Sequence, residues 1–283
     1  MSTPTSLALP DGVRRIEIRT RRGSFAALEA LPPHGVCERD TALLVPGYTG
    51  SKEDFLALLD LLATAGRRVL AIDMRGQYQT PGNGCYSPSA LGADIAAICS
   101  ESCVRHLLGH SYGGLVTREA VLDHECDLGS FTLLSSGPAA LTGPRAEELQ
   151  PLLAALDAYD VATIWTSYLE PQSVTADVPP EIVSFLRDRM LSNDPAALTA
   201  MAHHLLSAPD RTDELARRLT GLATLVIYGQ NDNAWLPTVQ EEMALALNAQ
   251  RVCVPGAVHS PNVEAPATTA ASLTTFWDRA EKI

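Results

Sequence analysis

Apolar runs and amphipathic stretches alternate along most of this chain. Ser51 and the acidic residues after it precede an apolar stripe that stops at Gly66, which predicts a helix over residues 51–66. The same spacing predicts helices over residues 87–101, 115–125 and 267–283. Short apolar runs predict buried strands, and they occupy residues 41–47, 67–73, 103–109, 130–136, 222–229 and 250–256.

Strands that alternate with helices predict an α/β architecture, in which helices cover both faces of a mostly parallel sheet. Two short alternating segments, residues 14–20 and 24–31, flank a turn at Arg22 and Gly23. They predict a hairpin, and we expect it to form an antiparallel edge of the sheet.

One long segment interrupts this alternation. From about Pro138 to Leu219 no strand pattern occurs, and helical patterns occupy residues 147–169, 180–191, 194–207 and 211–219. A helical insertion between two strands predicts a cap over one edge of the sheet. We therefore divide the chain into a core of residues 1–137 and 210–283 and a helical cap of residues 138–209.

Composition narrows the class of protein. The 283 residues are 46% hydrophobic and 19% charged, which is ordinary for a soluble globular protein. The formal net charge of −12 disfavours binding to a nucleic-acid backbone. No apolar stretch reaches the length of a membrane span, and the first residues lack the basic and apolar regions of a signal peptide. We expect a cytoplasmic protein without a nucleic-acid partner, and we leave open whether it forms a homodimer.

The cysteines do not form a metal-ligand pattern. None belongs to a C-x-x-C pair, and none stands beside histidines at ligand spacing. We expect free thiols and no bound metal, and we leave a Cys99–Cys103 disulfide open as an alternative. The six cysteines lie at positions 37, 85, 99, 103, 126 and 253.

The clearest candidate chemistry lies between a strand pattern and a helix pattern. Residues 109–113 read Gly-His-Ser-Tyr-Gly, which fits the pattern G-x-S-x-G. A tight strand-to-helix turn holds such a serine in a strained backbone conformation, so its neighbours must be small, and Gly109 and Gly113 supply that space. The helix that follows points free N–H groups toward developing negative charge. We therefore predict that Ser111 is a nucleophile.

A serine hydroxyl needs a base to remove its proton, and a histidine held by a carboxylate is the usual solution. His259 follows the last strand pattern in a loop, so it can reach the sheet edge that carries Ser111. His110 adjoins the serine, but we expect its side chain to point elsewhere. The other histidines fit less well, and they stand at positions 34, 106, 124, 203 and 204.

Asp232 is the best candidate for the carboxylate, because it stands just beyond the strand pattern of residues 222–229. The alternative for this residue is a turn or helix cap, where Asp is common. Asp73 also ends a strand pattern, but it precedes the serine, and we assign it a structural role as a partner of Arg75 or of a nearby turn. The chain order serine, aspartate, histidine is typical of one particular fold.

With Ser111, Asp232 and His259 in this order, the chain resembles members of the alpha/beta hydrolase family, in particular bacterial esterases with a helical cap. The resemblance covers nearly the whole chain, including the order of strands and the position of the cap. It implies that the backbone N–H groups of Tyr48 and Tyr112 hold the oxyanion. The family often has His-Gly in the loop that carries the first of these donors, where this chain has Pro46-Gly47.

The stretch that begins Asp73-Met74-Arg75-Gly76 also resembles a family loop, of the form Asp-x-Arg-Gly. It departs from the family at residues 77–79, Gln-Tyr-Gln, where a small residue is frequent. We assign this loop to the scaffold and the pocket rim, without a chemical role.

We expect a serine hydrolase that cleaves an ester through a Ser-His-Asp triad and an acyl-enzyme, without a cofactor. A carboxylesterase for a small or medium apolar acyl substrate is the first choice. Thioesterase, lactonase, C–C bond hydrolase and cofactor-free perhydrolase remain alternatives, and so does a non-catalytic protein that binds a small ligand. Haloalkane dehalogenases and typical epoxide hydrolases are disfavoured, because those relatives carry aspartate where Ser111 stands.

The cap and the loop after Asp232 supply the candidates for the substrate pocket. These are Trp165 and His203 in the cap and Trp235 in the loop. The alternatives are a packing role for each tryptophan and a solvent-facing position for His203. An apolar cap suits an acyl chain or a small ring-bearing ester.

Overall fold

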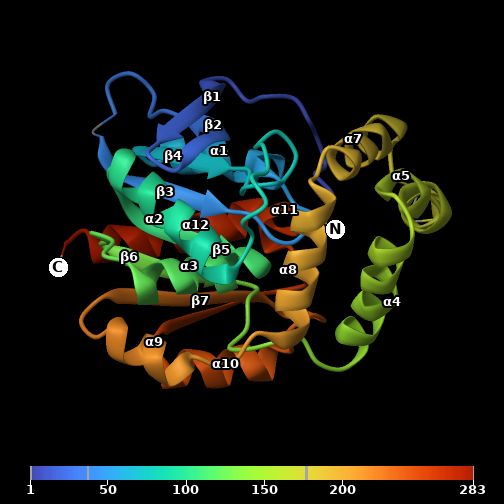
Figure 1. Ribbon diagram of the computed structural model, residues 1–283. Helices are drawn as coiled ribbons and strands as arrows, with labels where there is room; N and C mark the ends of the chain where they lie inside the picture. The colour runs from blue at the N-terminus through green and yellow to red at the C-terminus, as the bar shows by residue number, and fades with distance from the viewer. Residues whose placement is uncertain (1, 37, 176–177, 283) are drawn as a thin grey trace.

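The computed structural model describes residues 2–36, 38–175 and 178–282. Its centre is a twisted sheet of eight strands in the order β1-β2-β4-β3-β5-β6-β7-β8 (Figure 1). The strands are β1 (Val13–Thr20), β2 (Gly23–Ala30), β3 (Arg39–Val45), β4 (Arg67–Ile72), β5 (Val104–His110), β6 (Ser130–Leu134), β7 (Ala223–Gly229) and β8 (Gln250–Val254). β2 runs antiparallel to its neighbours β1 and β4, and the remaining neighbours pair in parallel. The predicted fold class and the edge hairpin are confirmed.

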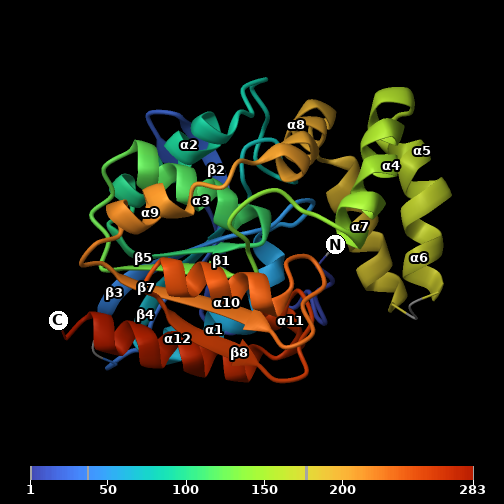
Figure 2. The same ribbon diagram turned by 90° about the horizontal axis from the view of Figure 1, so that it is seen from below.

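Helices cover both faces of the sheet (Figure 2). One face carries α2 (Pro88–Glu101), α3 (Tyr112–Asp123), α9 (Thr212–Arg218) and α10 (Pro237–Ala246), whose apolar side chains share one core cluster. The other face carries α1 (Leu56–Thr64) and α12 (Pro266–Ala280), which build a second cluster. A short 3-10 helix over Lys52–Phe55 leads into α1, and α11 (Pro261–Glu264) precedes α12. The apolar pattern predicted neither α10 nor α11.

Between β6 and β7 the described part of the chain is helical. The helices before α9 are α4 (Pro144–Ala158), α5 (Val161–Ile164), a π-helical segment (Trp165–Leu169), α6 (Glu170–Thr175), α7 (Pro180–Leu191) and α8 (Pro195–Ser207). In both views α4 to α7 stand apart from the sheet, whereas α8 lies nearer to it. Met201 and Leu205 of α8 belong to the cluster formed by α2 and α3. The predicted cap of residues 138–209 spans α4 to α8, and its boundaries stay a prediction.

The helical pattern over residues 147–169 breaks where Asp160 begins a new helix. The Asp160 carboxylate accepts a hydrogen bond from the Thr163 N–H at 2.7 Å, which caps α5. α4 therefore ends at Ala158, and α5 starts in a new direction. The helix cap at Asp160 therefore determines where the helix breaks, although the apolar spacing continues through this point.

A fully buried ion pair joins the cap to the core. Arg189 of α7 lies 2.7 Å from Asp54 Oδ1, and both side chains are without solvent exposure. A second guanidinium nitrogen of Arg189 donates to the Ser2 carbonyl at 2.8 Å. Since removing one partner of such a pair leaves an unpaired buried charge, α7 is held firmly against the core.

Five cysteines lie in the described residues, and all five are free thiols: Cys85, Cys99, Cys103, Cys126 and Cys253. Cys37 lies outside the described residues. Within the described ranges, no helix has both the length and the apolar character needed to cross a bilayer.

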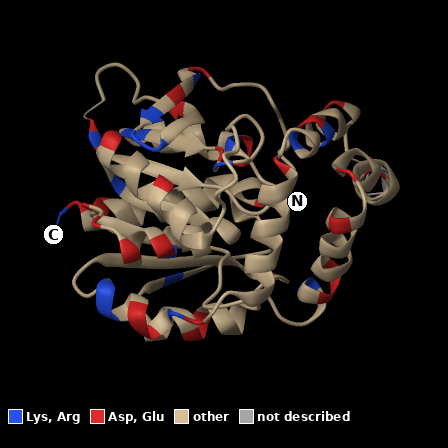
Figure 3. Ribbon diagram, in the orientation of Figure 1, with Lys and Arg blue, Asp and Glu red and all other residues tan. Residues whose placement is uncertain are grey.

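A partly buried ionic network holds the last helix against the amino ends of the strands (Figure 3 colours the acidic and basic residues). Arg67, at the start of β4, has no exposed side-chain surface and lies 2.6 Å from Asp278 and 2.8 Å from Glu281. His106 of β5 stacks on Trp277 with ring centroids 5.1 Å apart, and its Nε2–H donates to Glu281 at 2.9 Å. Arg67 is thus the buried cation between α12 and the sheet.

We predict that Arg67→Met lowers the free energy of unfolding by about 2 kcal/mol, because two carboxylates lose their buried partner. Arg39→Met is the matched control: Arg39 contacts the same two carboxylates but is 38% exposed. Its loss should cost less than about 1 kcal/mol. Urea denaturation of both variants measures the difference, and equal losses would contradict the assignment.

Candidate active site

Ser111 stands between β5 and α3 in a strained turn. Its backbone has φ 53° and ψ −122°, and its N–H donates to the Leu134 carbonyl of β6 at 2.9 Å. A Cβ on Gly113 would clash with the Val45 and Pro46 carbonyl oxygens, and a Cβ on Gly109 would clash with Thr117 and Gly113 itself. The turn therefore requires glycines on both sides, and it presents the serine side chain at the carboxyl edge of the sheet.

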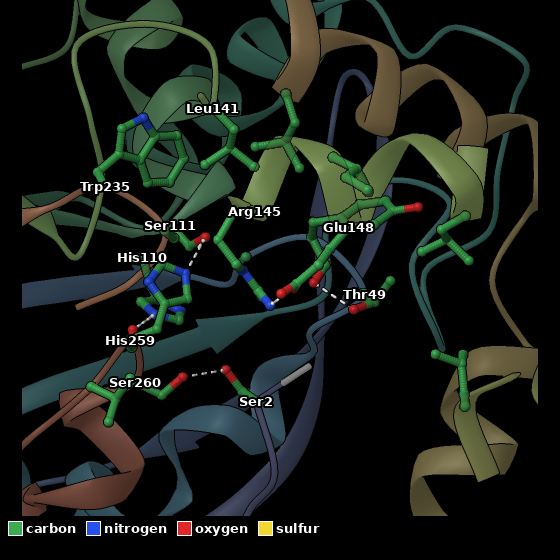
Figure 4. A pocket seen from close by; sticks show the side chains of 18 of the residues that line it. Ser2, Thr49, His110, Ser111, Leu141, Arg145, Glu148, Trp235, His259 and Ser260 are labelled. Carbon is green, nitrogen blue, oxygen red and sulfur yellow. Dashed lines mark hydrogen bonds and ion pairs between the residues drawn. The ribbon is translucent and has the colours of Figure 1, made fainter. Parts of the chain in front are cut away.

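The three predicted catalytic residues meet at this edge, although they come from separate loops (Figure 4 shows Ser111 and His259). His259 Nε2 lies 2.9 Å from Ser111 Oγ, and His259 Nδ1 lies 2.9 Å from Asp232 Oδ1. Because a carboxylate only accepts, Nδ1 carries the proton, and Nε2 is left to accept the serine proton. This arrangement can draw a proton from Ser111.

Asp232 is held by more than the histidine. The residue is buried, its Oδ1 also accepts from the Ala234 N–H at 2.9 Å, and its Oδ2 accepts from Gln240 Nε2 at 3.0 Å. Gln240 in turn donates to the Trp235 carbonyl at 2.7 Å. These donors hold the Asp232 carboxylate in place beside His259. The strand and helix patterns gave no signal for Gln240, because the helix that carries it was not predicted.

His110 points away from the serine hydroxyl, as expected, but it has a partner in the site. Its Nε2–H donates to the backbone carbonyl of His259 at 2.9 Å. Burial, and to a lesser extent the neighbouring His259, lowers the pKa of His110 to about 3. The ring therefore stays neutral near pH 7, and it supports the loop of His259.

The loop after β3 passes directly beside the serine. A Cβ on Gly47 would lie 3.0 Å from Ser111 Cβ and 3.4 Å from Ser111 Oγ, so a side chain at this position would crowd the serine. The Gly50 N–H donates to the Gly47 carbonyl at 3.1 Å and closes a turn. The N–H of Tyr48 has no acceptor in the described ranges, and the N–H of Tyr112 lies in the first turn of α3, where a helix offers none.

The cavity in front of Ser111 is enclosed by core loops and cap helices. Trp235, a predicted pocket residue, lines it and donates its indole N–H to the Ala139 carbonyl at 3.1 Å. Arg145 and Glu148 of α4, an ion pair 2.6 Å apart, face the same space (Figure 4). Apolar side chains form much of the wall: Leu141, Leu149, Leu152, Leu169 and Leu205.

Two other predicted pocket residues lie elsewhere. Trp165 is fully buried in the apolar cluster that joins α5 to α7 and α8, together with Ile164 and Phe185, so it packs the cap and does not line this cavity. His203 is exposed on α8, while the neighbouring His204 is buried beside Tyr112. Helical periodicity explains the second error, because adjacent residues on a helix face different directions.

Of the two partners predicted for Asp73, the structure shows the nearby turn, because Asp73 Oδ2 accepts from the Gln79 N–H at 3.3 Å, and it does not show Arg75. The Asp73 carboxylate lies 2.7 Å from the buried Lys52 ammonium, whereas Arg75 pairs with Asp94 at 2.6 Å. Burial raises the pKa of Asp73 to about 6, although Lys52 acts in the opposite direction. Asp73 therefore has a structural role, as expected, but with another cation.

One group of side chains in the described residues has metal-ligand geometry. Potential ligand atoms of Asp40, His106 and Glu281 lie within 4.8 Å of one another. His106 is near the amino end of β5, and Ser111 follows the carboxyl end, so the two places are on opposite edges of the sheet. The Glu281 carboxylate is already bound by Arg67 and His106.

Comparisons with known proteins identify the family of the chain. A family model described as "Alpha/beta hydrolase family" matches residues 42–272. A pimeloyl-(acyl-carrier protein) methyl ester esterase of Aeromonas hydrophila is 28% identical over 211 residues, which cover 70% of this chain and 80% of the relative. A protein of Variovorax paradoxus named as a carbamate hydrolase is 31% identical over 107 residues, which cover 36% of this chain and 40% of the relative.

Solved structures show the same fold. An esterase from Thermogutta terrifontis superposes with a TM-score of 0.73 at 23% identity, covering 95% of this chain and 99% of the other. An enol-lactonase from Burkholderia xenovorans superposes with a TM-score of 0.74 at 18% identity, covering 93% and 100%. With its family match over most of its length, the chain belongs to the alpha/beta hydrolase family and is an enzyme of that family.

Proposed function

We propose that this protein is a serine hydrolase that cleaves a carboxylic ester of a small or medium apolar acyl group. The observation that carries the proposal is the continuous hydrogen-bonded series from Ser111 Oγ through His259 to Asp232, with both joining distances at 2.9 Å. The named methyl ester esterase among its relatives supports the same reaction class.

In the first half of the reaction, Ser111 Oγ attacks the ester carbonyl carbon while His259 Nε2 takes the serine proton. The negative charge that develops on the carbonyl oxygen is stabilised by the N–H groups of Tyr48 and Tyr112. As the C–O bond breaks, His259 returns the proton to the leaving alcohol, and the acyl group stays on Ser111.

In the second half, water attacks the acyl-enzyme and gives its proton to His259. The oxyanion forms again at the same two N–H groups, and its collapse releases the carboxylic acid as Ser111 recovers the proton. Asp232 stabilises the imidazolium in both halves, and its buried hydrogen bonds keep it oriented.

The cavity wall supports an apolar acyl group. Leucines from α4, α8 and the loop before α4 surround the space in front of Ser111. A carbamate is a second candidate, because the relative from Variovorax paradoxus is named for it and the same nucleophile can attack a carbamate carbonyl.

We predict that Ser111→Ala folds normally and lowers kcat for a 4-nitrophenyl ester by about a million-fold, because the nucleophile is gone. The matched control is Ser272→Ala, a partly exposed serine on α12 that should leave turnover unchanged. Labelling with a fluorophosphonate should disappear only in the first variant. Retained hydrolysis by Ser111→Ala would refute the nucleophile.

We predict that Asp232→Asn lowers kcat by about ten-thousand-fold, because an amide facing His259 favours the wrong tautomer. Asp210→Asn is the control, since the Asp210 carboxylate accepts from the Thr212 N–H at the start of α9 and does not contact the triad. Steady-state kinetics of both variants test the role. Near-normal turnover by Asp232→Asn would move the role to another carboxylate.

We predict a clear optimum in acyl chain length across a series of 4-nitrophenyl esters, and Leu152→Trp should move it to shorter chains by filling the cavity. For the longest esters kcat/KM should fall by about tenfold or more. Leu61→Trp, at an exposed position on α1, is the control. An unchanged length profile in Leu152→Trp would show that the acyl group binds elsewhere.

A further inference from the structure

The side chain of Gln77 is buried and its amide is fixed in one orientation. Gln77 stands in the loop after β4, where its Oε1 accepts from the Met74 N–H at 3.2 Å. Its Nε2 donates to the Gly47 carbonyl at 2.9 Å. Because a backbone N–H must face the amide oxygen, the amide nitrogen has to face Gly47. The main-chain N–H of Gln77 also bonds to the Met74 carbonyl at 2.9 Å, which anchors the residue itself.

The Gly47 carbonyl belongs to the same peptide unit as the Tyr48 N–H. The chain has no cis peptide among its described residues, and in a trans peptide the C=O and N–H point in opposite directions. With the carbonyl turned toward Gln77, the Tyr48 N–H is turned to the other side of the peptide. Gly47 itself lies against Ser111.

This peptide needs an external restraint. A Cβ on Gly47 would crowd Ser111, and glycine at this position leaves the adjacent peptide free to rotate. The turn that follows adds strain, because Thr49 has φ 56°, a region that β-branched residues disfavour. The turn hydrogen bond from Gly50 alone therefore holds the peptide less firmly than two donors do.

The same loop also holds the far end of the turn. Asp73 Oδ1 accepts from the Lys52 N–H at 2.8 Å, and Asp73 Oδ2 pairs with the Lys52 ammonium. The loop after β4 thus binds the loop after β3 at Gly47 and again at Lys52. The first of these two contacts, through Gln77, restrains the peptide unit that carries the Tyr48 N–H.

We propose that Gln77 is a positioning residue for acyl transfer: its side-chain amide holds the Gly47–Tyr48 peptide so that the Tyr48 N–H faces the oxyanion formed at Ser111. The inference rests on the proposed function and extends it to the loop after β4. Gln77 does not touch the substrate, and its effect on the reaction passes through the backbone of Gly47.

The test compares Gln77→Met with Gln79→Met. Methionine has nearly the length and volume of glutamine but no donor, and Gln79 is exposed in the same loop. The second-order rate constant for fluorophosphonate labelling of Ser111 should fall by about 10- to 100-fold in Gln77→Met, because one oxyanion donor is misplaced. Gln79→Met should label at the wild-type rate.

Further readouts separate positioning from general stability. With the best 4-nitrophenyl ester, kcat should fall by the same factor while KM stays within about twofold. The Ki of a trifluoromethyl ketone, which forms an oxyanion on Ser111, should rise in parallel with the loss in kcat. Gln77→His, which restores an N–H donor, should recover part of the labelling rate.

Wild-type labelling and ketone affinity in Gln77→Met would overturn the inference. So would a loss that Gln77→His fails to recover although thermal unfolding shows that both variants are folded. If Gln77→Met does not fold, the labelling rate of Gln77→His is compared with that of the wild type. Partial or full labelling by Gln77→His supports the inference, and a folded Gln77→His that does not label contradicts it. Labelling of Ser111→Ala at the wild-type rate would instead refute the proposed function.

Discussion

A backbone with φ 53° at Ser111 constrains the parts of the site that surround it. Such a conformation costs a non-glycine residue of order 1–3 kcal/mol, so the surrounding structure must hold it in place. Gly47, Gly109 and Gly113 stand where any side chain would collide with this turn or its neighbours. The strand before it is paired on both sides, and the helix after it is packed on α2. The rigid core thus absorbs the strain, and the serine is presented at the edge of the sheet.

The site around this turn is assembled by hydrogen bonds between loops. His110 holds the carbonyl of His259, Gln240 holds the carboxylate of Asp232, and Gln77 holds the carbonyl of Gly47. None of these three side chains belongs to the predicted triad, yet His110 and Gln77 each bind a residue beside the serine, and Gln240 binds the carboxylate that faces His259. The positions of the groups around Ser111 therefore depend on buried amide and imidazole side chains as well as on the triad.

The sequence predicted the sheet, the insertion and the three residues that meet at Ser111, because apolar runs and a motif between a strand and a helix are local signals. It did not predict what depends on contacts between distant segments. For Asp73 the sequence offered Arg75 or a nearby turn, whereas the buried cation of Lys52 reaches it from the preceding loop. Trp165 was a candidate for the pocket with packing in the cap core as the alternative, and the structure shows the packing. Gln77 read as a departure from a family pattern, and only its contact with Gly47 gives it a role.

The inserted helices have two roles, attachment to the core and lining of the cavity, and the buried pair between Arg189 and Asp54 serves the first. Arg189 of α7 and the buried side chains of α8 attach these helices to the core, whereas the inserted side chains that line the cavity come mostly from α4 and the π-helical segment. Residues of α4 can therefore change without disturbing the attachment. Because of this division, natural or laboratory selection can change the side chains of one segment, and with them the substrate that the cavity accepts, while the catalytic residues stay the same.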